Sequence, residues 1–413
     1  MAAASARVLG LPVGMNGTQA IANWLIDGAR SAATSEAVLA EFCDRLLACG
    51  FPIGRVGLFI LTLHPQIMGQ RFLWNPGVPV DVGPASYETF QTEDFRRSPV
   101  RHAIDHNASV RRKLEDEKCA LDFALTRELK SQGVTDYFVA PLFFFNGAVH
   151  AASFATLEPG GFTDQQIADL GQLMAPLTRV AEARALLSMA GSLLDTYVGG
   201  HAGSRVLAGQ IRRGDTTTIN AVIWLSDMRG FTRLADQVPP QTLVNHLNRY
   251  FDCQVPAILK HGGEVLKFMG DGLLAIFAVA ADGTDDQMVC AAALDAAREA
   301  RAAVAAAATD AADGSGHGLR FGLALHIGEV SYGNIGSESR LDFTCIGPAV
   351  NLAARIEKLT GELGRTVLAS DDFAGHLPSE FTPVGKFALR GFGTDRTVFG
   401  LKDEAEPDRK LPP

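Results

Sequence analysis

The stretch Leu266-Lys-Phe-Met-Gly-Asp-Gly-Leu-Leu-Ala-Ile-Phe277 places an apolar run on each side of Gly270 and Asp271. This pattern predicts a β-hairpin over residues 264–278 that turns at the glycine. A second acid, Asp227, follows the apolar run Ile219-Asn-Ala-Val-Ile-Trp-Leu225, which predicts a buried strand. Two carboxylates at strand ends near glycines indicate a divalent-metal site for phosphate chemistry. The alternative is a turn residue and a helix cap that bind nothing.

The residues around the two acids predict alternating strands and helices. Helices are expected over residues 240–260, 285–309 and 349–360, a loop over 310–318, and a further strand over 319–327. These helices are expected to cover one face of the sheet, which gives an α+β sandwich.

Length and composition limit the classes of protein. A chain of 413 residues can hold about two or three domains, each with its own core. The net charge of -9 argues against a nucleic acid as the main partner, although a metal-bound anionic substrate remains allowed. The six cysteines show no metal-ligand spacing, so reduced thiols are expected. The first residues lack the pattern of a signal peptide, and we expect a cytoplasmic protein.

The longest apolar run, Tyr137-Phe-Val-Ala-Pro-Leu-Phe-Phe-Phe145, ends at Asn146-Gly147, and a second run follows. This spacing predicts a hairpin, and neither arm is long enough to cross a bilayer as a helix, so no membrane segment is expected. A strand is predicted over residues 55–63, and a helix begins near Thr163, which can serve as its N-cap.

The order of elements over residues 17–179, which follow an N-terminal tail of residues 1–16, resembles a GAF-type sensor domain. The resemblance implies an antiparallel sheet flanked by helices and a pocket for a small regulatory ligand. A dimerisation or packing module without a ligand is the alternative. His150 and Cys119 are conceivable ligands of a metal or haem, but a hydrogen-bonded core histidine is the favoured interpretation of His150.

Residues 180–214 are interpreted as a helical linker. Its segment from Ala181 to Val198 carries apolar residues at helical spacing and ends at Gly199-Gly200. Paired with a second copy, this helix would transmit a rotation or shift between domains; alone, it would pack on its own domain. The charged, proline-rich residues 403–413 are expected to form a mobile tail.

Residues 215–402 resemble the catalytic domain of class III nucleotidyl cyclases, whose fold is a ferredoxin-like α/β sandwich. Five segments in the family's order carry the resemblance: Ser226-Asp-Met-Arg-Gly-Phe-Thr232, Lys267-Phe-Met-Gly-Asp-Gly272, His326-Ile-Gly-Glu-Val330, Gly333-Asn-Ile-Gly336 and Leu341-Asp-Phe-Thr-Cys-Ile-Gly-Pro-Ala-Val-Asn-Leu-Ala-Ala-Arg-Ile-Glu357. The resemblance implies a cyclase that converts a nucleoside triphosphate to a cyclic nucleotide and pyrophosphate. His326, Glu329 and Cys345 are expected to be packing residues.

The resemblance assigns metal and phosphate roles to the first motif and the hairpin turn. Asp227 and Asp271 would bind two Mg²⁺ or Mn²⁺ ions, with the backbone carbonyl of Met228 as a further ligand. The segment Gly230-Phe-Thr232 opens a helix, so its free N–H groups can bind phosphate oxygens.

Asn351 and Arg355 lie four residues apart on a predicted helix and therefore share one face. By resemblance, Asn351 orients the ribose and Arg355 stabilises the transition state. Arg390, in Leu389-Arg-Gly391, is expected to contact the terminal phosphates.

Lys267 and Thr344 match the family's purine-selecting pair. A lysine donor suits N1 of adenine, and a threonine hydroxyl can accept from its amino group, which favours ATP. Threonine at the second position is typical of class IIIb enzymes, for which stimulation by bicarbonate is common, so such stimulation is a hypothesis here.

The resemblance also implies a homodimer in which the aspartates of one subunit face Lys267, Thr344, Asn351 and Arg355 of the other. The expected product is cyclic AMP. Two alternatives remain: a guanylate cyclase, which Lys267 disfavours, and a non-catalytic nucleotide-binding or dimerisation module, which would usually have lost one of these residues.

Overall fold

The computed structural model describes residues 17–62, 64, 67–279, 285–309 and 318–404. Contacts between residues divide the chain into two compact units, which meet in the sequence at Leu193 and Leu194. The position of Leu63, residues 1–16, the loop over 310–317 and most of the predicted tail lie outside the described residues.

The first unit contains an antiparallel sheet of six strands in the order β3-β2-β1-β6-β5-β4. The strands are β1 (Arg55–Leu61), β2 (Ile67–Trp74), β3 (Asp81–Ser86), β4 (Val110–Lys113), β5 (Asp136–Phe143) and β6 (Val149–Thr156). The predicted hairpin is confirmed, because β5 pairs with β6 and Gly147 has a φ of 84° in the connecting turn.

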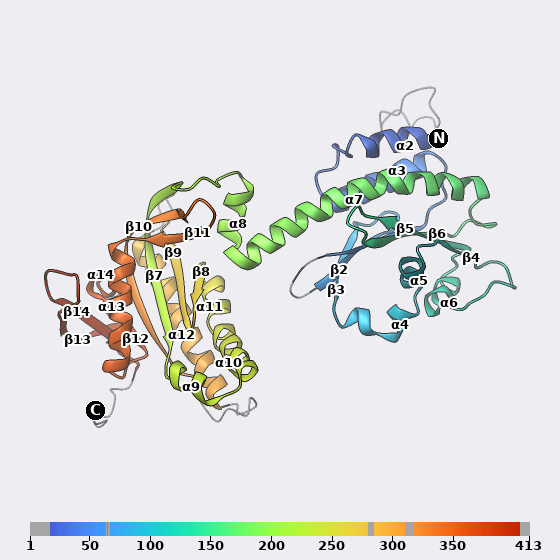
Figure 1. The fold of residues 1–413 in the computed structure, drawn as a ribbon. Coiled ribbons are helices and arrows are strands. Elements are labelled where there is room, and N and C mark those ends of the chain that lie inside the picture. The colour runs from blue at the N-terminus through green and yellow to red at the C-terminus, as the bar shows by residue number, and fades with distance from the viewer. Residues whose placement is uncertain (1–16, 63, 65–66, 280–284, 310–317, 405–413) are drawn as a thin grey trace. The chain divides into compact units, whose positions relative to one another are not determined.

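Helices cover both faces of this sheet (Figure 1). They are α2 (Gly17–Ile26), α3 (Ser35–Ala48), the short 3-10 helix η1 (Thr89–Gln91), α4 (Glu93–Arg96), α5 (Pro99–His106), α6 (Ala124–Ser131) and α7 (Asp164–Val198). Helices α2, α3 and α7 pack with Val56 and Leu58 of β1 in one apolar core, whereas α5 and α6 pack with Tyr137 and Val139 of β5 in another. The result is an antiparallel sheet between two helical layers.

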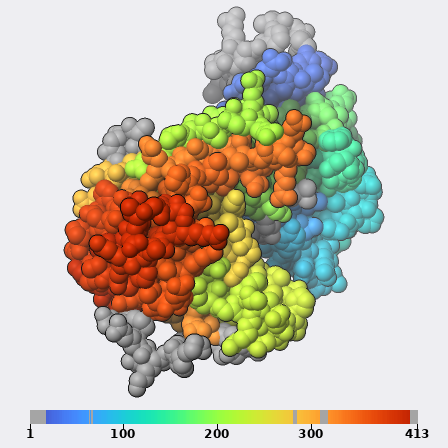
Figure 2. All heavy atoms as spheres, turned by 60° about the vertical axis from the view of Figure 1, so that its left-hand side comes forward, coloured from blue at the N-terminus to red at the C-terminus, as the bar shows by residue number. Residues whose placement is uncertain are grey.

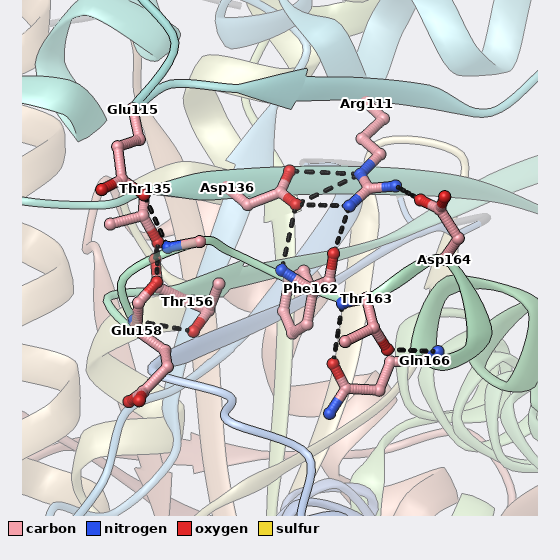
Figure 3. Close-up of polar contacts among 11 residues, drawn as sticks. Arg111, Glu115, Thr135, Asp136, Thr156, Glu158, Phe162, Thr163, Asp164 and Gln166 are labelled. Atoms are coloured by element: carbon pink, nitrogen blue, oxygen red, sulfur yellow. Dashed lines mark hydrogen bonds and ion pairs between the residues drawn. The ribbon is translucent and has the colours of Figure 1, made fainter.

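Polar contacts fix the start of α7 against β4 and β5 (Figure 3). Thr163 caps the helix as predicted: its hydroxyl accepts from the N–H of Gln166 at 3.1 Å, and the Gln166 side chain accepts from the N–H of Thr163 at 2.9 Å. Buried Asp136 accepts from Arg111 at 2.8 Å and from the N–H of Phe162 at 3.1 Å. These bonds satisfy a carboxylate that has no access to water.

Helix α7 is longer than expected from sequence. The helix predicted near Thr163 and the linker helix predicted from Ala181 form one element of 35 residues, with Pro176 inside it. The helix ends at Val198, before Gly199 with a φ of 89°, where the sequence placed its end. The expected boundary between residues 179 and 180 thus falls within a continuous helix.

The second unit contains an eight-stranded sheet in the order β13-β14-β12-β10-β7-β9-β8, with β11 paired to β10. The strands are β7 (Thr216–Met228), β8 (Glu264–Met269), β9 (Gly272–Ala278), β10 (Phe321–Gly336), β11 (Leu341–Ile346), β12 (Val367–Ser370), β13 (Phe381–Phe387) and β14 (Arg396–Leu401). Strands β10 and β12 are parallel, and the other neighbours are antiparallel. The hairpin predicted over residues 264–278 is confirmed.

The expectation that helices cover one face of this sheet is wrong. The helices are α8 (Gly200–Leu207), α9 (Phe231–Gln237), α10 (Pro240–Asp252), α11 (Val255–Lys260), α12 (Asp286–Thr309), α13 (Pro348–Glu362) and α14 (Asp371–His376). On β7, Val222 and Trp224 pack in a core with α10, α11 and α12, whereas Ile223 packs in a core with α8 and α13. Buried residues on both sides of the strands require helices on both faces.

Two further expectations fail locally. The single helix predicted over residues 240–260 is broken into α10 and α11, because Pro256 lacks an N–H and would clash with the preceding turn. The predicted tail begins too early, since Asp403 accepts from Arg301 at 2.8 Å and the Glu404 carbonyl accepts from Arg365 at 2.9 Å.

Candidate active site

Asp227 and Asp271 lie together where β7 and β9 meet. Asp227 is paired in register with Gly272, next to Asp271, and Gly270 supplies the turn with a φ of 67°. Burial, the negative charges of Asp271 and Glu357, and a hydrogen bond with Asp271 raise the pKa of Asp227 to about 6. This excess of negative charge fits a divalent cation.

No third His, Cys, Asp or Glu completes a metal-binding group with these acids in the part of the chain that the structure describes. Backbone carbonyls, water and substrate oxygens are further ligands that Mg²⁺ accepts. Met228, the residue whose carbonyl was expected to contribute, has a buried side chain at the end of β7.

The expected phosphate-binding segment forms the start of α9. Gly230 has a φ of 77°, a conformation that favours glycine, and no side chain caps the helix. Phe231 is partly buried against the core, and Thr232 is exposed. The first N–H groups of α9 therefore lie close in sequence to Asp227 without a side-chain partner.

A β-bulge in β8 turns Lys267 toward β11. Val265 pairs with Ala275 and Lys267 with the next residue of β9, Leu274, so Leu266 is the extra residue. Leu266 and Leu274 belong to the core on the side of β11 and α13, whereas Val265 packs in the opposite core. Without the extra residue, the alternation of a strand would place Lys267 on the same face as Val265.

The structure brings Lys267 near Cys345, the neighbour of Thr344 in β11. Burial raises the pKa of Cys345 to about 11, and the positive charge of nearby Lys267 acts in the opposite direction. Thr344, the neighbour of Cys345, is buried, and its hydroxyl has no hydrogen-bond partner among the described residues. An unsatisfied buried hydroxyl is rare in a folded protein and fits a polar group that arrives with a ligand.

Helix α13 follows directly after β11 and carries Asn351 and Arg355. Asn351 is exposed and Arg355 partly buried, and neither side chain has a hydrogen bond or ion pair within residues 17–404 as far as they are described. Arg390 is exposed at a turn after β13 and is likewise without a partner in the described residues. Among the described residues, no contact joins Asn351 or Arg355 to either aspartate.

Two charged residues beside the aspartates were not predicted. Arg229 forms an ion pair of 3.0 Å with Glu357 of α13, and both side chains are largely buried. Glu357 occurs among apolar residues on the buried face of its helix, between Ile356 and Leu359. An acid at a buried helical position is the sequence signal that would have indicated a partner.

Strand β8, which carries Lys267, and strand β10, which pairs with β11, also hold helix α8. Glu264, three residues before Lys267, accepts from the hydroxyl of Tyr332 at 2.7 Å and from the N–H of Ala202 at 3.2 Å. His201 lies 3.0 Å from the same hydroxyl. Figure 2 shows the green residues near α8 beside the orange residues of β10 and β11. Tyr332 pairs in register with Cys345, the neighbour of Thr344.

Of the residues expected to pack, His150, His326 and Cys345 are buried, whereas Glu329 is exposed on β10, so the expectation for Glu329 is wrong. Nδ1 of His150 accepts from the N–H of Leu61 at 2.9 Å, and His326 lies 2.8 Å from the hydroxyl of Ser370. Both histidines are buried. All six cysteines are free, and three of them are buried.

Comparisons with known proteins found similarity in the second unit. Residues 215–402 match the model of the adenylate and guanylate cyclase catalytic domain. An adenylate cyclase of Anabaena cylindrica is 32% identical over 200 residues, which are 47% of this chain and 37% of that protein. Adenylate cyclase 1 of Rhizobium meliloti is 29% identical over 177 residues, 42% of this chain and 26% of that protein. The chain thus matches only about a third of the length of these relatives.

Solved structures were also matched. The adenylyl cyclase CyaB from P. aeruginosa is 25% identical, with 48% of this chain and 100% of that chain covered and a TM-score of 0.41. The guanylyl cyclase Cya2 is 28% identical, with 47% and 97% covered and a TM-score of 0.40. Across the described residues, every helix is too short or too polar to cross a membrane.

Proposed function

We propose, on the premise that residues 215–402 form a catalytic domain of the adenylate and guanylate cyclase family, that the protein is an adenylate cyclase. It converts ATP to 3′,5′-cyclic AMP and pyrophosphate. The observation that supports the choice of ATP is that Lys267, a donor, lies near Cys345 of β11, whose neighbour Thr344 has a buried hydroxyl acceptor without a partner among the described residues. Adenine presents the complementary pattern, with N1 as acceptor and its amino group as donor.

The remaining roles follow from the chemistry of each side chain. Asn351 orients the ribose so that its 3′-oxygen lies in line with the α-phosphorus, and Arg355 stabilises the negative charge that develops on the phosphate. The N–H groups of Gly230, Phe231 and Thr232 bind phosphate oxygens. Arg390 contacts the terminal phosphates. The bond from the ribose oxygen to phosphorus forms as the bond to pyrophosphate breaks.

Asp227 and Asp271, with the Met228 carbonyl, would hold two Mg²⁺ or Mn²⁺ ions. When bound, the ions supply activation of the 3′-hydroxyl and neutralisation of charge on the phosphates. The proximity of the two carboxylates and the raised pKa of Asp227 support this assignment.

We propose a homodimer with two shared sites. Asn351 and Arg355 have no partner for their side chains within the described part of their own subunit. Apolar side chains next to the site residues are exposed: Phe268 and Met269 follow Lys267, and Ile346 follows Thr344 by two residues. Exposed apolar residues beside an incomplete site favour a second copy of the chain as the occupant of this face.

We also propose that residues 17–179 form a GAF-like regulatory domain and that residues 180–214 transmit its signal. A cavity of about 270 Å³ lies between the sheet and the segment from η1 to α5, and its lining is mainly apolar, including Phe59, Phe90, Phe95, Val100 and Ile104. This lining favours a small apolar molecule. Native mass spectrometry of the purified protein would detect one as an added mass; its absence, with no response to added ligands, favours a packing module.

The experiment that tests the function compares ATP with GTP. With Mn²⁺ present, we expect cyclic AMP production to exceed cyclic GMP production, and Asp227→Ala to abolish both while the protein stays folded. Higher turnover of GTP would indicate a guanylate cyclase, and no turnover of either would indicate a non-catalytic module. Undiminished activity of Asp227→Ala would refute the metal assignment.

Two finer parts belong to the proposal, and the first has a separate test. Bicarbonate stimulation is tested by cyclic AMP output with and without bicarbonate at fixed pH, and an unchanged output would end it. We place the enzyme in the cytoplasm, where ATP is available and free thiols such as its six cysteines stay reduced.

A further inference from the structure

Arg229 links the aspartate-bearing end of β7 to the middle of α13. It lies two residues after Asp227, and its N–H donates to the carbonyl of Arg320 at 2.9 Å. Its Nη2 donates to Oε1 of Glu357 at 3.0 Å and lies 3.3 Å from the carbonyl oxygen of Glu357. The two side chains are only 26% and 9% exposed, so water screens this ion pair weakly.

The surrounding backbone leaves a slot for this guanidinium. Gly322 of β10 pairs in register with Asp227, and a Cβ there would lie 1.9 Å from Nη2 of Arg229 and 2.0 Å from the hydroxyl of Thr360. A Cβ on Gly361 would lie 3.2 Å from Nη1 of Arg229. Gly322 is not in the left-handed conformation, so the space for Arg229 and Thr360 accounts for its lack of a side chain.

Helix α13 has different roles on its two sides. Glu357 is on the buried side, whereas Asn351 is exposed and Arg355 partly buried. A link at Glu357 therefore fixes the position and rotation of the helix that presents Asn351 and Arg355.

We propose that Arg229 and Glu357 are positioning residues that hold the metal-binding end of β7 and helix α13 in one fixed arrangement. This inference rests on the proposed function. In the shared-site dimer, a subunit uses Asp227 and Asp271 in one site and donates Asn351 and Arg355 to the other. The pair thereby links the two active sites through the body of each subunit.

Heterodimers with one intact site test this proposal. One subunit carries Arg355→Ala and supplies the two aspartates; we call it the metal-donating subunit. The other carries Asp271→Ala and supplies Asn351 and Arg355; we call it the helix-donating subunit. Two different affinity tags isolate the heterodimer. Arg229→Met is then placed on either subunit, and kcat and the half-saturating Mn²⁺ concentration are measured at saturating ATP.

Each placement has its own expected result. On the metal-donating subunit, the half-saturating Mn²⁺ concentration should rise roughly tenfold to a hundredfold, as when support of a metal ligand is lost. On the helix-donating subunit, whose aspartates are not used, kcat should fall on the order of tenfold to a hundredfold because Arg355 is misplaced, with Mn²⁺ dependence unchanged. Glu357→Gln on that subunit should act in the same way.

A matched control is Arg298→Met, which breaks the 2.5 Å ion pair with Glu380 elsewhere in the second unit and should change neither quantity. An unchanged kcat with Arg229→Met on the helix-donating subunit would overturn the proposal. The proposal would also be overturned if Arg229→Met changed kcat and the half-saturating Mn²⁺ concentration equally on either subunit and lowered the melting temperature. Such a result would indicate a general loss of structure. A parent heterodimer without activity would instead refute the shared site and, with it, this inference.

Discussion

At the scale of single residues, the direction of Lys267 depends on its neighbour Leu266. The motif identified the lysine, but regular alternation along β8 would have sent its side chain to the face of Val265. The bulge at Leu266 turns it toward β11 and Thr344. The residue proposed to read the base is thus positioned by a local irregularity of the backbone.

We expect Lys267→Glu to change the preference between nucleotides. A carboxylate can accept from the N1–H and amino group of guanine but repels the acceptor N1 of adenine, so the ratio of ATP to GTP turnover should fall roughly tenfold or more. Parallel assays with each nucleotide measure this ratio. Lys386→Glu on the edge strand β13 is the control, and an equal change in both variants would contradict the base-reading role.

His150 is a second residue with a measurable consequence. Burial lowers its pKa from 6.5 to about 4. Between pH 6.5 and 4 the imidazole of His150 binds a proton in the unfolded chain but not in the folded unit. The stability of the first unit that depends on neutral His150 is therefore complete above pH 6.5 and is lost as the pH falls toward 4. Hydrogen exchange of β1 and β6, measured relative to the intrinsic exchange rate at each pH, should therefore accelerate as the pH falls over this range.

His150→Gln should reduce that acceleration, because glutamine can still accept from the N–H of Leu61 but does not titrate. The exposed His106→Gln serves as a control and should leave the pH dependence unchanged. The same pH dependence in His150→Gln as in the wild type would show that other groups cause it.

At the scale of elements, the start of α7 depends on Asp136. Its fully buried carboxylate accepts from Arg111 and from the N–H of Phe162, and Arg111 is only 21% exposed. Asp136→Ala would leave the largely buried guanidinium of Arg111 without its main partner. The free energy of unfolding of the first unit should therefore fall by about 3–5 kcal/mol. Urea denaturation measures this change.

Asp164 provides the matched control for this prediction. It binds the same guanidinium at 2.9 Å but its side chain is 90% exposed, so Asp164→Ala should change stability little. Equal effects of the two substitutions would contradict the importance of burial at Asp136.

The elements that sequence predicted well have strong local signals. Asn146-Gly147 and Gly270-Asp271 each stand between apolar runs, and both hairpins are confirmed. Elements defined by tertiary contacts were missed: the core with α8 and α13 on the second face of the sheet, and the pairing of Arg229 with Glu357, 128 residues apart. The break at Pro256 was available from sequence, but the helical pattern on both sides concealed it.

At the scale of the whole molecule, helix α8 joins the end of α7 to the purine-selecting strands. Gly199 lies between the two helices, and α8 is attached through Glu264, Tyr332 and His201 to the strands of Lys267 and Thr344. A movement of α7 would therefore reach these residues through a short series of hydrogen bonds. In the proposed enzyme, α7 and α8 are the route by which residues 17–179 act on the active site.

The central claim is that each active site is shared between two copies of the chain. The most direct test mixes Asp271→Ala with Arg355→Ala, each inactive alone, and measures cyclic AMP production after the subunits have exchanged. One of the two sites in each heterodimer is then intact, and about half of the dimers in an equal mixture are heterodimers, so we predict a return of activity toward about a quarter of that of the wild-type dimer. A mixture that stays inactive although native mass spectrometry shows the heterodimer would contradict the account.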